Sequence, residues 1–241
     1  MQKIIIFLTC LLAFPVSVVA ESVGLPFVKP GDSWTYRSTI EKGQNGWVQK
    51  STECTVVRTN STSILLSIKD KGSTQAPKEQ LVGRDWCRFR NVNGKEEVVN
   101  RPFLFPLEPG KSWEIEYTED HPNREHRKEQ FNHHYIVIGW EDVDVPAGHF
   151  TAIKVESEGK WKAELEPSIK VGSSSQTSRD GATTVIQSQK VAPQTATGRL
   201  YKAFWYVPEI KRQVKSIEEY YSAGGVRNER YTEELESFKF Q

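Results

Sequence analysis

The segment from Ile153 to Glu166 alternates without interruption between apolar or small side chains and charged side chains. Val155, Trp161 and Leu165 fall on one face, and lysine or glutamate occupies every position of the other. Alternation with a period of two is typical of a β-strand with one solvated face, and it leaves no apolar stripe for a helix. The pattern predicts one unusually long strand, and therefore a large, strongly twisted or curled antiparallel sheet.

Turn signals divide the surrounding sequence into hairpins. Pro146 and Gly148 suit a tight turn between residues 135–145 and the long strand. Asn93-Gly94 is typical of a type I′ turn, and Gly224-Gly225 indicates a third hairpin. No segment is a convincing helix. Five further segments have strand-like composition: 34–40, 47–58, 64–69, 113–118 and 199–207. The sequence therefore predicts an all-β fold, with a single large antiparallel sheet curled into a half-barrel or a β-sandwich.

Residues 1–20 have the pattern of a secretion signal. Lys3 precedes a mostly apolar run, and small residues end that run at Ala20. This order predicts cleavage after Ala20. Pro15 interrupts the run and makes a membrane anchor the weaker alternative, because a span needs about 20 apolar residues. Cys10 lies within the run behind a threonine, which argues against lipid attachment.

Removal of the signal would leave residues 21–241 as a single β-rich domain in the periplasm or secreted, with no further transmembrane segment. Lysine and arginine total 32, aspartate and glutamate total 31, and the two signs are interleaved. A nucleic acid or an anionic membrane is therefore not an expected partner.

A repeated motif and a long polar segment add detail to this single-domain prediction. Residues 30–34 and 109–113 share the pattern P-G-x-S-W, and each leads into an alternating segment. The domain could contain an internal duplication starting near residues 30 and 109, or could use one turn type twice. Residues 167–198 are rich in serine, threonine, glutamine and glycine, which predicts a long mobile loop.

The expected mature chain has two cysteines, Cys54 and Cys87. In an exported protein a pair of cysteines indicates one disulfide. Two free buried thiols are the alternative.

No catalytic motif is present. G-x-S-x-G, a phosphate-binding loop and a dinucleotide fingerprint are all missing from the sequence. All five histidines lie between His121 and His149, but their spacing matches no zinc signature, and His133 and His134 should point to opposite faces of a strand. We therefore expect no catalytic residue, metal or cofactor.

The tryptophans are numerous for a domain of this size. All seven lie beyond the signal: Trp34, Trp47, Trp86, Trp113, Trp140, Trp161 and Trp205. Such residues could fill a core, stack on sugars or line an apolar groove. Exposed flat rings would favour a sugar ligand, and a recessed lining would favour a lipid.

Residues 143–155 resemble the V-x-V-P-A-G-x-F hairpin of the TapB-like group, which are bacterial exported β-rich proteins of unknown function. Trp205-Tyr206-Val207-Pro208 is similar to the W-Y-x-P segment of that group, and residues 107–113 are similar to its opening. The chain departs from the group at Lys211-Arg212, where a glycine is expected before a V-K pair. The resemblance implies a fold similar in outline to the curled half-barrels of periplasmic lipoprotein carriers.

These patterns lead us to expect an exported, non-catalytic protein of the bacterial envelope. Its concave face would bind an apolar or amphipathic ligand, such as a lipid-like molecule, or an envelope partner protein. The candidate lining residues are Val155, Trp161, Leu165, Tyr201 and Trp205, although these could simply pack against a second layer. A carbohydrate-binding or cell-surface structural module is the alternative, and a hydrolase is a third hypothesis.

Overall fold

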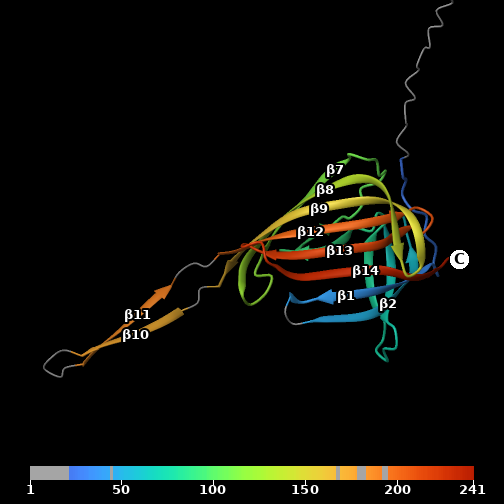
Figure 1. The fold of residues 1–241 in the computed structure, drawn as a ribbon. Coiled ribbons are helices and arrows are strands. Elements are labelled where there is room, and N and C mark those ends of the chain that lie inside the picture. Colours follow the sequence, from blue (N-terminus) through green and yellow to red (C-terminus); the bar gives the residue numbers. More distant parts are fainter. Residues whose placement is uncertain (1–21, 44–45, 167–168, 178–182, 192–194) are drawn as a thin grey trace, which may run out of the picture.

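The computed structural model describes residues 22–43, 46–166, 169–177, 183–191 and 195–241 (Figure 1). The predicted secretion signal and its cleavage after Ala20 lie outside these residues. None of the described residues forms a helix long and apolar enough to cross a bilayer.

Twelve strands form one antiparallel sheet, in the order β6-β5-β4-β3-β2-β1-β14-β13-β12-β9-β8-β7. The first six in chain order are β1 (Ser33–Glu41), β2 (Trp47–Thr59), β3 (Ser63–Asp70), β4 (Lys78–Gly83), β5 (Arg88–Val92) and β6 (Lys95–Asn100). The others are β7 (Ser112–Asp120), β8 (His126–Val145), β9 (Gly148–Leu165), β12 (Thr195–Val207), β13 (Arg212–Ser222) and β14 (Arg227–Lys239). The all-β prediction is confirmed.

The sheet curls until its two edge strands approach each other. In Figure 1 the strands from β7 to β2 lie side by side on the near side, and the teal strands from β3 to β6 turn behind them. Side chains of the β5–β6 hairpin bridge to β7: Asn93 Nδ2 donates to the Thr118 carbonyl at 3.0 Å, and Asn93 Oδ1 accepts from the Asp120 amide at 2.9 Å. We call this junction the seam.

The long alternating strand is β9, and its alternation is confirmed. Its inward positions Val155, Ser157 and Gly159 are buried, while Glu158 and Lys160 are exposed. β9 pairs with β8 as the predicted hairpin, over the whole length from Leu165 to the turn.

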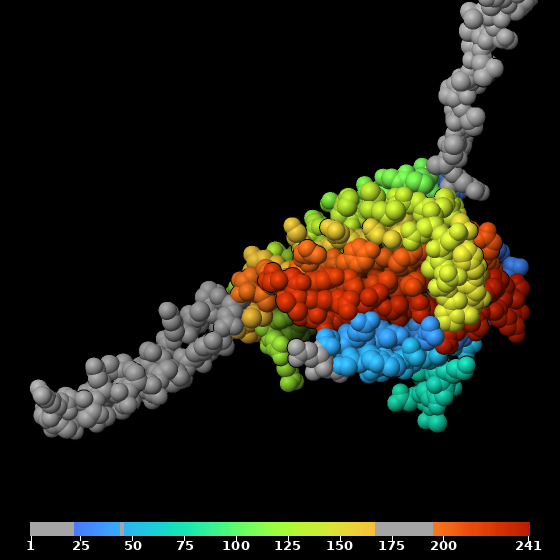
Figure 2. All heavy atoms as spheres, in the orientation of Figure 1, coloured from blue at the N-terminus to red at the C-terminus, as the bar shows by residue number. Residues whose placement is uncertain are grey.

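The β8–β9 hairpin does not stay in the sheet to its end. A bulge opposite Lys154 shifts the register at Gly139, whose φ of 143° is one that residues with a side chain rarely adopt. Beyond it the hairpin tip crosses the outer face of β12, β13 and β14, as the yellow-green band over orange and red in Figure 2. The Ala147 amide donates to the Leu235 carbonyl of β14 at 2.9 Å. Part of the sheet is thereby covered by a second layer.

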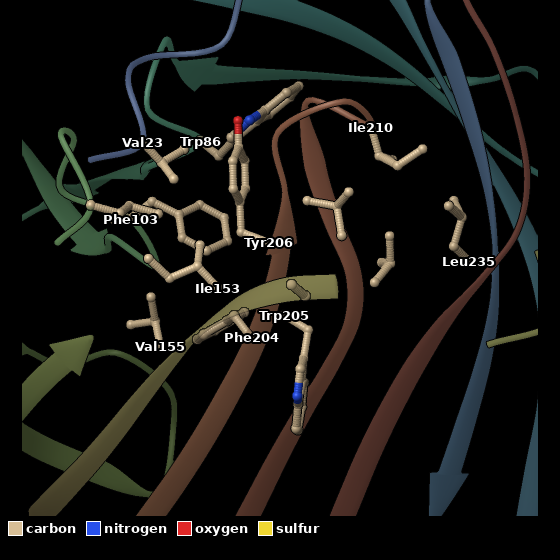
Figure 3. Close-up of a cluster of buried hydrophobic side chains, with 14 of the residues drawn as sticks. Val23, Trp86, Phe103, Ile153, Val155, Phe204, Trp205, Tyr206, Ile210 and Leu235 are labelled. Carbon is tan, nitrogen blue, oxygen red and sulfur yellow. The ribbon is translucent and has the colours of Figure 1, made fainter. Parts of the chain in front are cut away.

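One end of the curled interior is filled with apolar side chains (Figure 3). Phe103 lies between β6 and β7, and its ring centroid is 4.9 Å from that of Tyr206. Leu107 follows in the same segment and forms a β-bridge with Val23. Phe103, Leu107 and Trp34 are completely buried. The segment between β6 and β7 therefore closes this end of the interior.

The two P-G-x-S-W segments have the same backbone contacts. The glycine amide donates to the carbonyl of Val56 in the first copy and of Val137 in the second, both at 2.8 Å. The amides of Val56 and Val137 return a hydrogen bond to the residue after the glycine, both at 2.9 Å. Each copy leads into a strand, β1 or β7. A recurrent turn and a duplication would both give this geometry, so the duplication stays a prediction.

The expectation of a long loop differs from the structure. Within residues 167–198, where we expected a loop, the backbone forms β10 (Ile169–Thr177) and β11 (Thr183–Val191), which pair with each other in a separate sheet. The mobility of this segment stays a prediction.

The predicted Cys54–Cys87 disulfide is not formed: both residues are buried free cysteines. Cys54 is in β2 and Cys87 directly precedes β5, so β3 and β4 lie between them in the sheet. Neighbouring strands are about 4.8 Å apart, whereas a disulfide joins Cα atoms less than about 7 Å apart. The alternative of two free buried thiols describes this structure.

Candidate functional site

A cavity of about 620 Å³ lies inside the curled sheet, between β1–β4 and β12–β14. One wall, on β3 and β4, combines the apolar side chains of Leu66, Ile68 and Val82 with polar ones such as Lys78 and Gln80. The other wall is polar and is formed by alternate residues of β13 and β14: Ser216, Glu218, Tyr220, Tyr231 and Glu233. The cavity therefore presents an apolar surface and a hydrogen-bonding surface to the same volume.

A second compartment lies towards β7 and β8. It has a volume of about 770 Å³ and shares Arg88, Glu218 and Tyr220 with the first. Leu200, Lys202 and His133 extend its lining. The two compartments thus have charged residues in common in their walls.

The shared charges form a small network around Glu218. Lys202 Nζ lies 3.5 Å from Glu218 Oε2, and Arg88 Nη2 lies 3.8 Å from Glu218 Oε1. The Tyr220 hydroxyl donates to Glu218 at 3.2 Å. Burial alone would raise the pKa of Glu218, but Lys202 and Arg88 together hold it below its usual value. Burial lowers the pKa of Lys202. The carboxylate is therefore charged and is matched by two cations.

His133 lies in the wall of the second compartment and is only 3% exposed. Its Nδ1 atom is buried and has no hydrogen-bond partner in the described part of the chain. Burial, and secondly the positive charge of Lys202, lowers the pKa of His133 to about 4. The imidazole is therefore neutral near pH 7.

Arg212 lies at the wall of the first cavity inside a box of three aromatic rings. Its guanidinium carbon is 4.9 Å from the ring centroid of Trp86, 5.2 Å from that of Tyr36 and 5.5 Å from that of Trp34. Its Nε and Nη1 atoms are buried without hydrogen-bond partners among the described residues. No described carboxylate is within ion-pair distance of this guanidinium.

The same three rings hold the backbone that carries Arg212. Trp34 Nε1 donates to the Ile210 carbonyl at 2.8 Å, and Trp86 Nε1 donates to the Lys211 carbonyl at 3.0 Å. The Tyr36 hydroxyl donates to the Gln213 carbonyl at 2.6 Å. The position of Arg212 is thus fixed from β1 and from the segment before β5, both distant in sequence.

The five lining residues expected from the sequence do not form one surface. Val155, Trp161 and Leu165 share the inner face of β9, where Val155 is part of the core. Tyr201 and Trp205 have the opposite parity on β12 and lie on the outer face. None of the five is part of the two interior compartments, although Trp161 lines a separate depression of about 700 Å³. Their role in ligand binding stays untested.

Tyr201 and Trp205 have partners on the outer face. The Tyr201 hydroxyl donates to Glu156 at 2.9 Å. Trp205 Nε1 donates to Glu141 of β8, and Lys154 Nζ lies 5.0 Å from the Trp205 ring. The contact of Trp205 with Glu141 attaches the crossing hairpin to the sheet, and both side chains have polar partners.

Most tryptophans are buried. Trp34, Trp86, Trp113 and Trp205 belong to the core, and Trp161 is half-buried. Trp47 is 66% exposed and Trp140 is 38% exposed. These two are on β2 and β8, which are not neighbours in the sheet.

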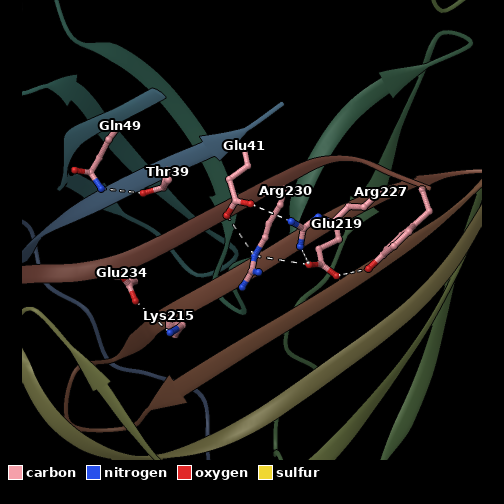
Figure 4. A network of polar contacts seen from close by, with 9 residues as sticks. Thr39, Glu41, Gln49, Lys215, Glu219, Arg227, Arg230 and Glu234 are labelled. Carbon is pink, nitrogen blue, oxygen red and sulfur yellow. Dashed lines mark hydrogen bonds and ion pairs between the residues drawn. The ribbon is translucent and has the colours of Figure 1, made fainter. Parts of the chain in front are cut away.

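Ion pairs connect neighbouring strands on the part of the outer face that the second layer leaves uncovered (Figure 4). Arg227 and Arg230 of β14 connect Glu41 of β1 with Glu219 of β13, at distances of 3.0 to 4.0 Å. Lys215 Nζ lies 3.1 Å from Glu234. Partly exposed pairs of this kind contribute little each, and they mark this face as solvated.

His133 and His134 point to opposite faces, as expected: the first is buried and the second is exposed. Within the residues that the structure describes, no group of three histidine, cysteine, aspartate or glutamate residues could hold a metal ion.

No protein-family model and no curated protein matches the chain. Two solved structures are similar to most of it. A putative lipoprotein from Parabacteroides distasonis is 14% identical with a TM-score of 0.47, over 91% of this chain and 100% of that chain. A putative exported protein with a YmcC-like fold from Bacteroides fragilis is 15% identical with a TM-score of 0.43, over 90% of this chain and 99% of that chain. Similarity this low assigns no function, and the TapB-like resemblance stays a prediction.

Proposed function

We propose that this chain is an exported, non-catalytic protein of the bacterial envelope, periplasmic or secreted, that binds one amphipathic small molecule inside its curled sheet. The observation that supports this most is the interior cavity of about 620 Å³, whose lining combines apolar side chains of β3 and β4 with hydroxyl and carboxylate groups of β13 and β14. Sites for small ligands are hollows of about 300–1,000 Å³ with apolar linings and a few polar groups.

The two walls suggest how a ligand would lie. Leu66, Ile68 and Val82 would contact its apolar part, and burial of that part supplies most of the binding free energy. Ser216, Tyr220 and Tyr231 offer hydroxyl groups to its polar part.

The export half of the proposal rests on the pattern of residues 1–20. A carbohydrate-binding role is less well supported, because the two most exposed tryptophans, Trp47 and Trp140, are on strands that are not neighbours. A stacking platform needs adjacent rings.

Binding can be tested with N-phenyl-1-naphthylamine, an uncharged apolar fluorophore, and with native mass spectrometry of protein purified from a bacterial periplasm. Ile68→Trp places a large ring in the cavity, and we expect it to weaken fluorophore binding at least tenfold. Val57→Trp is the matched control, because Val57 is on the same β2–β3 hairpin but is 44% exposed and outside the cavity lining.

A wild-type protein that neither binds the fluorophore nor carries a small molecule into the mass spectrometer would overturn the proposed function. Equal effects of the two tryptophan variants would also contradict it, because binding would then lie elsewhere.

A further inference from the structure

We infer that the ligand of the proposed cavity carries an anionic head group, a carboxylate or a phosphate, and that Arg212 binds it. This inference rests on the proposed function and adds the chemical class of the ligand. It follows from the arrangement around Arg212.

Arg212 forms no ion pair with any described carboxylate. A guanidinium buried away from water is costly unless it is paired and hydrogen-bonded. Its Nε and Nη1 atoms have no partner among the described residues, although the side chain lines the cavity. By contrast, the completely buried Asp32 is paired with Lys211 at 2.8 Å, and the buried Lys202 is paired with Glu218 at 3.5 Å.

Three aromatic rings fix the position of the Arg212 guanidinium. Trp34, Tyr36 and Trp86 surround the guanidinium and hydrogen-bond the backbone on either side of Arg212. The rings favour the cation through their π faces, but they accept no hydrogen bond in the plane of the guanidinium. Beside the guanidinium lies the Cys54 thiol, which is only a weak acceptor. A group that is positioned in advance and has no strong acceptor matches a two-oxygen anion.

Glu233 is a carboxylate of the same cavity lining. Glu233 is held by the hydroxyl groups of Ser38 and Ser216, both at 3.4 Å, rather than by Arg212. Among the described residues no ion pair joins this carboxylate to Arg212, so an incoming anion would meet the guanidinium from the cavity that Arg212 lines.

Isothermal titration calorimetry with dodecanoate, dodecyl phosphate and the uncharged dodecanol, each below its aggregation concentration, tests this inference. We expect the wild-type protein to bind at least one of the two acids at least tenfold more tightly than dodecanol. Arg212→Met should abolish that preference while dodecanol binding stays within threefold. Arg37→Met is the matched control, since Arg37 pairs with Glu234 on the outer face.

Arg212→Lys guards against misfolding of the methionine variant, because it keeps the charge but cannot offer two parallel donors. It should show an intermediate preference, with circular dichroism unchanged. Titration with acetate and inorganic phosphate distinguishes a head-group site from a site for free anions: anion binding without dodecyl binding would contradict the amphipathic ligand but support the anion site.

Equal binding of dodecanoate, dodecyl phosphate and dodecanol by the wild type would overturn the role of Arg212 and leave the proposed function standing. Absence of binding for all three dodecyl compounds and both free anions would overturn the proposal and the inference together.

Discussion

His133 is a residue whose protonation and folding are coupled. It is 3% exposed, and the charged groups that face it are Lys202 of β12 and Glu218 of β13. Its pKa in the folded protein is about 4, against 6.5 for an unperturbed histidine. The folded state therefore favours the neutral imidazole. The resulting stability is complete above about pH 6.5 and is lost as the pH falls towards 4.

We predict that wild-type protein loses about 3 kcal/mol more unfolding free energy between pH 7 and pH 4 than His133→Phe does. Phenylalanine keeps an aromatic ring against Tyr135 but cannot bind a proton. Urea unfolding monitored by tryptophan fluorescence at several pH values measures the difference. His134→Phe, the exposed neighbour, should follow the wild-type pH dependence. Parallel curves for wild type and His133→Phe would show that the buried imidazole titrates normally.

The position of Arg212 in the cavity wall could not be predicted from the sequence. In β13, charged residues occur at both parities, for example Glu218 facing inwards and Glu219 facing outwards. An alternating pattern tells which residues share a face, but with charges on both faces it does not tell which face is concave. The candidate site was therefore not predictable, whereas the apolar face of β9 was.

Lys211, in the turn between β12 and β13, has a φ of 62°. This conformation suits glycine, the residue expected near here from the resemblance to the TapB-like group. The contacts of the lysine side chain compensate for this backbone strain. Its Nζ atom lies 2.8 Å from Oδ2 of the completely buried Asp32 and 4.2 Å from the Phe240 ring centroid. Burial alone would raise the pKa of Asp32, but the hydrogen bonds from Lys211 and two backbone amides hold it below its usual value.

We predict that Lys211→Ala destabilises the protein by about 2 kcal/mol, because it removes a charged hydrogen-bond donor from Asp32. Lys211→Gly removes the same donor but relieves the backbone strain, so it should be about 1 kcal/mol more stable than Lys211→Ala. Chemical denaturation of both variants measures this difference. The order would reverse if the turn were unstrained, because glycine also has the more flexible unfolded chain.

The turns of two hairpins were predictable from the sequence. The Asn93-Gly94 turn and the Pro146–Gly148 turn join β5 to β6 and β8 to β9, as predicted, because each turn depends on local backbone chemistry. The bend of the β8–β9 hairpin at Gly139 was missed, since a bulge needs only one extra residue and leaves little trace in the alternation. The β10–β11 strands were missed because their polar composition is also that of a loop.

The whole molecule depends on how its two sheet edges are held together. β6 and β7 are the ends of the strand order, and none of the described strands pairs with the outer side of β7. Asn93 connects them with both atoms of its amide, and Arg90 pairs with Glu119 alongside. Asn93 thus serves two purposes, because its φ of 51° also belongs to the hairpin turn. An open edge would expose unpaired backbone groups to other chains.

Asn93→Gly separates these purposes, since glycine keeps the turn conformation and removes the amide. We predict a loss of about 1–2 kcal/mol in unfolding free energy, from two hydrogen bonds at an exposed position. In hydrogen-exchange measurements the Asp120 amide should exchange at least tenfold faster, because its acceptor is gone, while the β1–β2 amides keep their protection. Unchanged exchange at Asp120 would mean that Arg90 and Glu119 hold the seam without Asn93. Faster exchange confined to β7 would instead establish that the interior is enclosed by a side-chain junction that is weaker than the backbone ladders on either side of it.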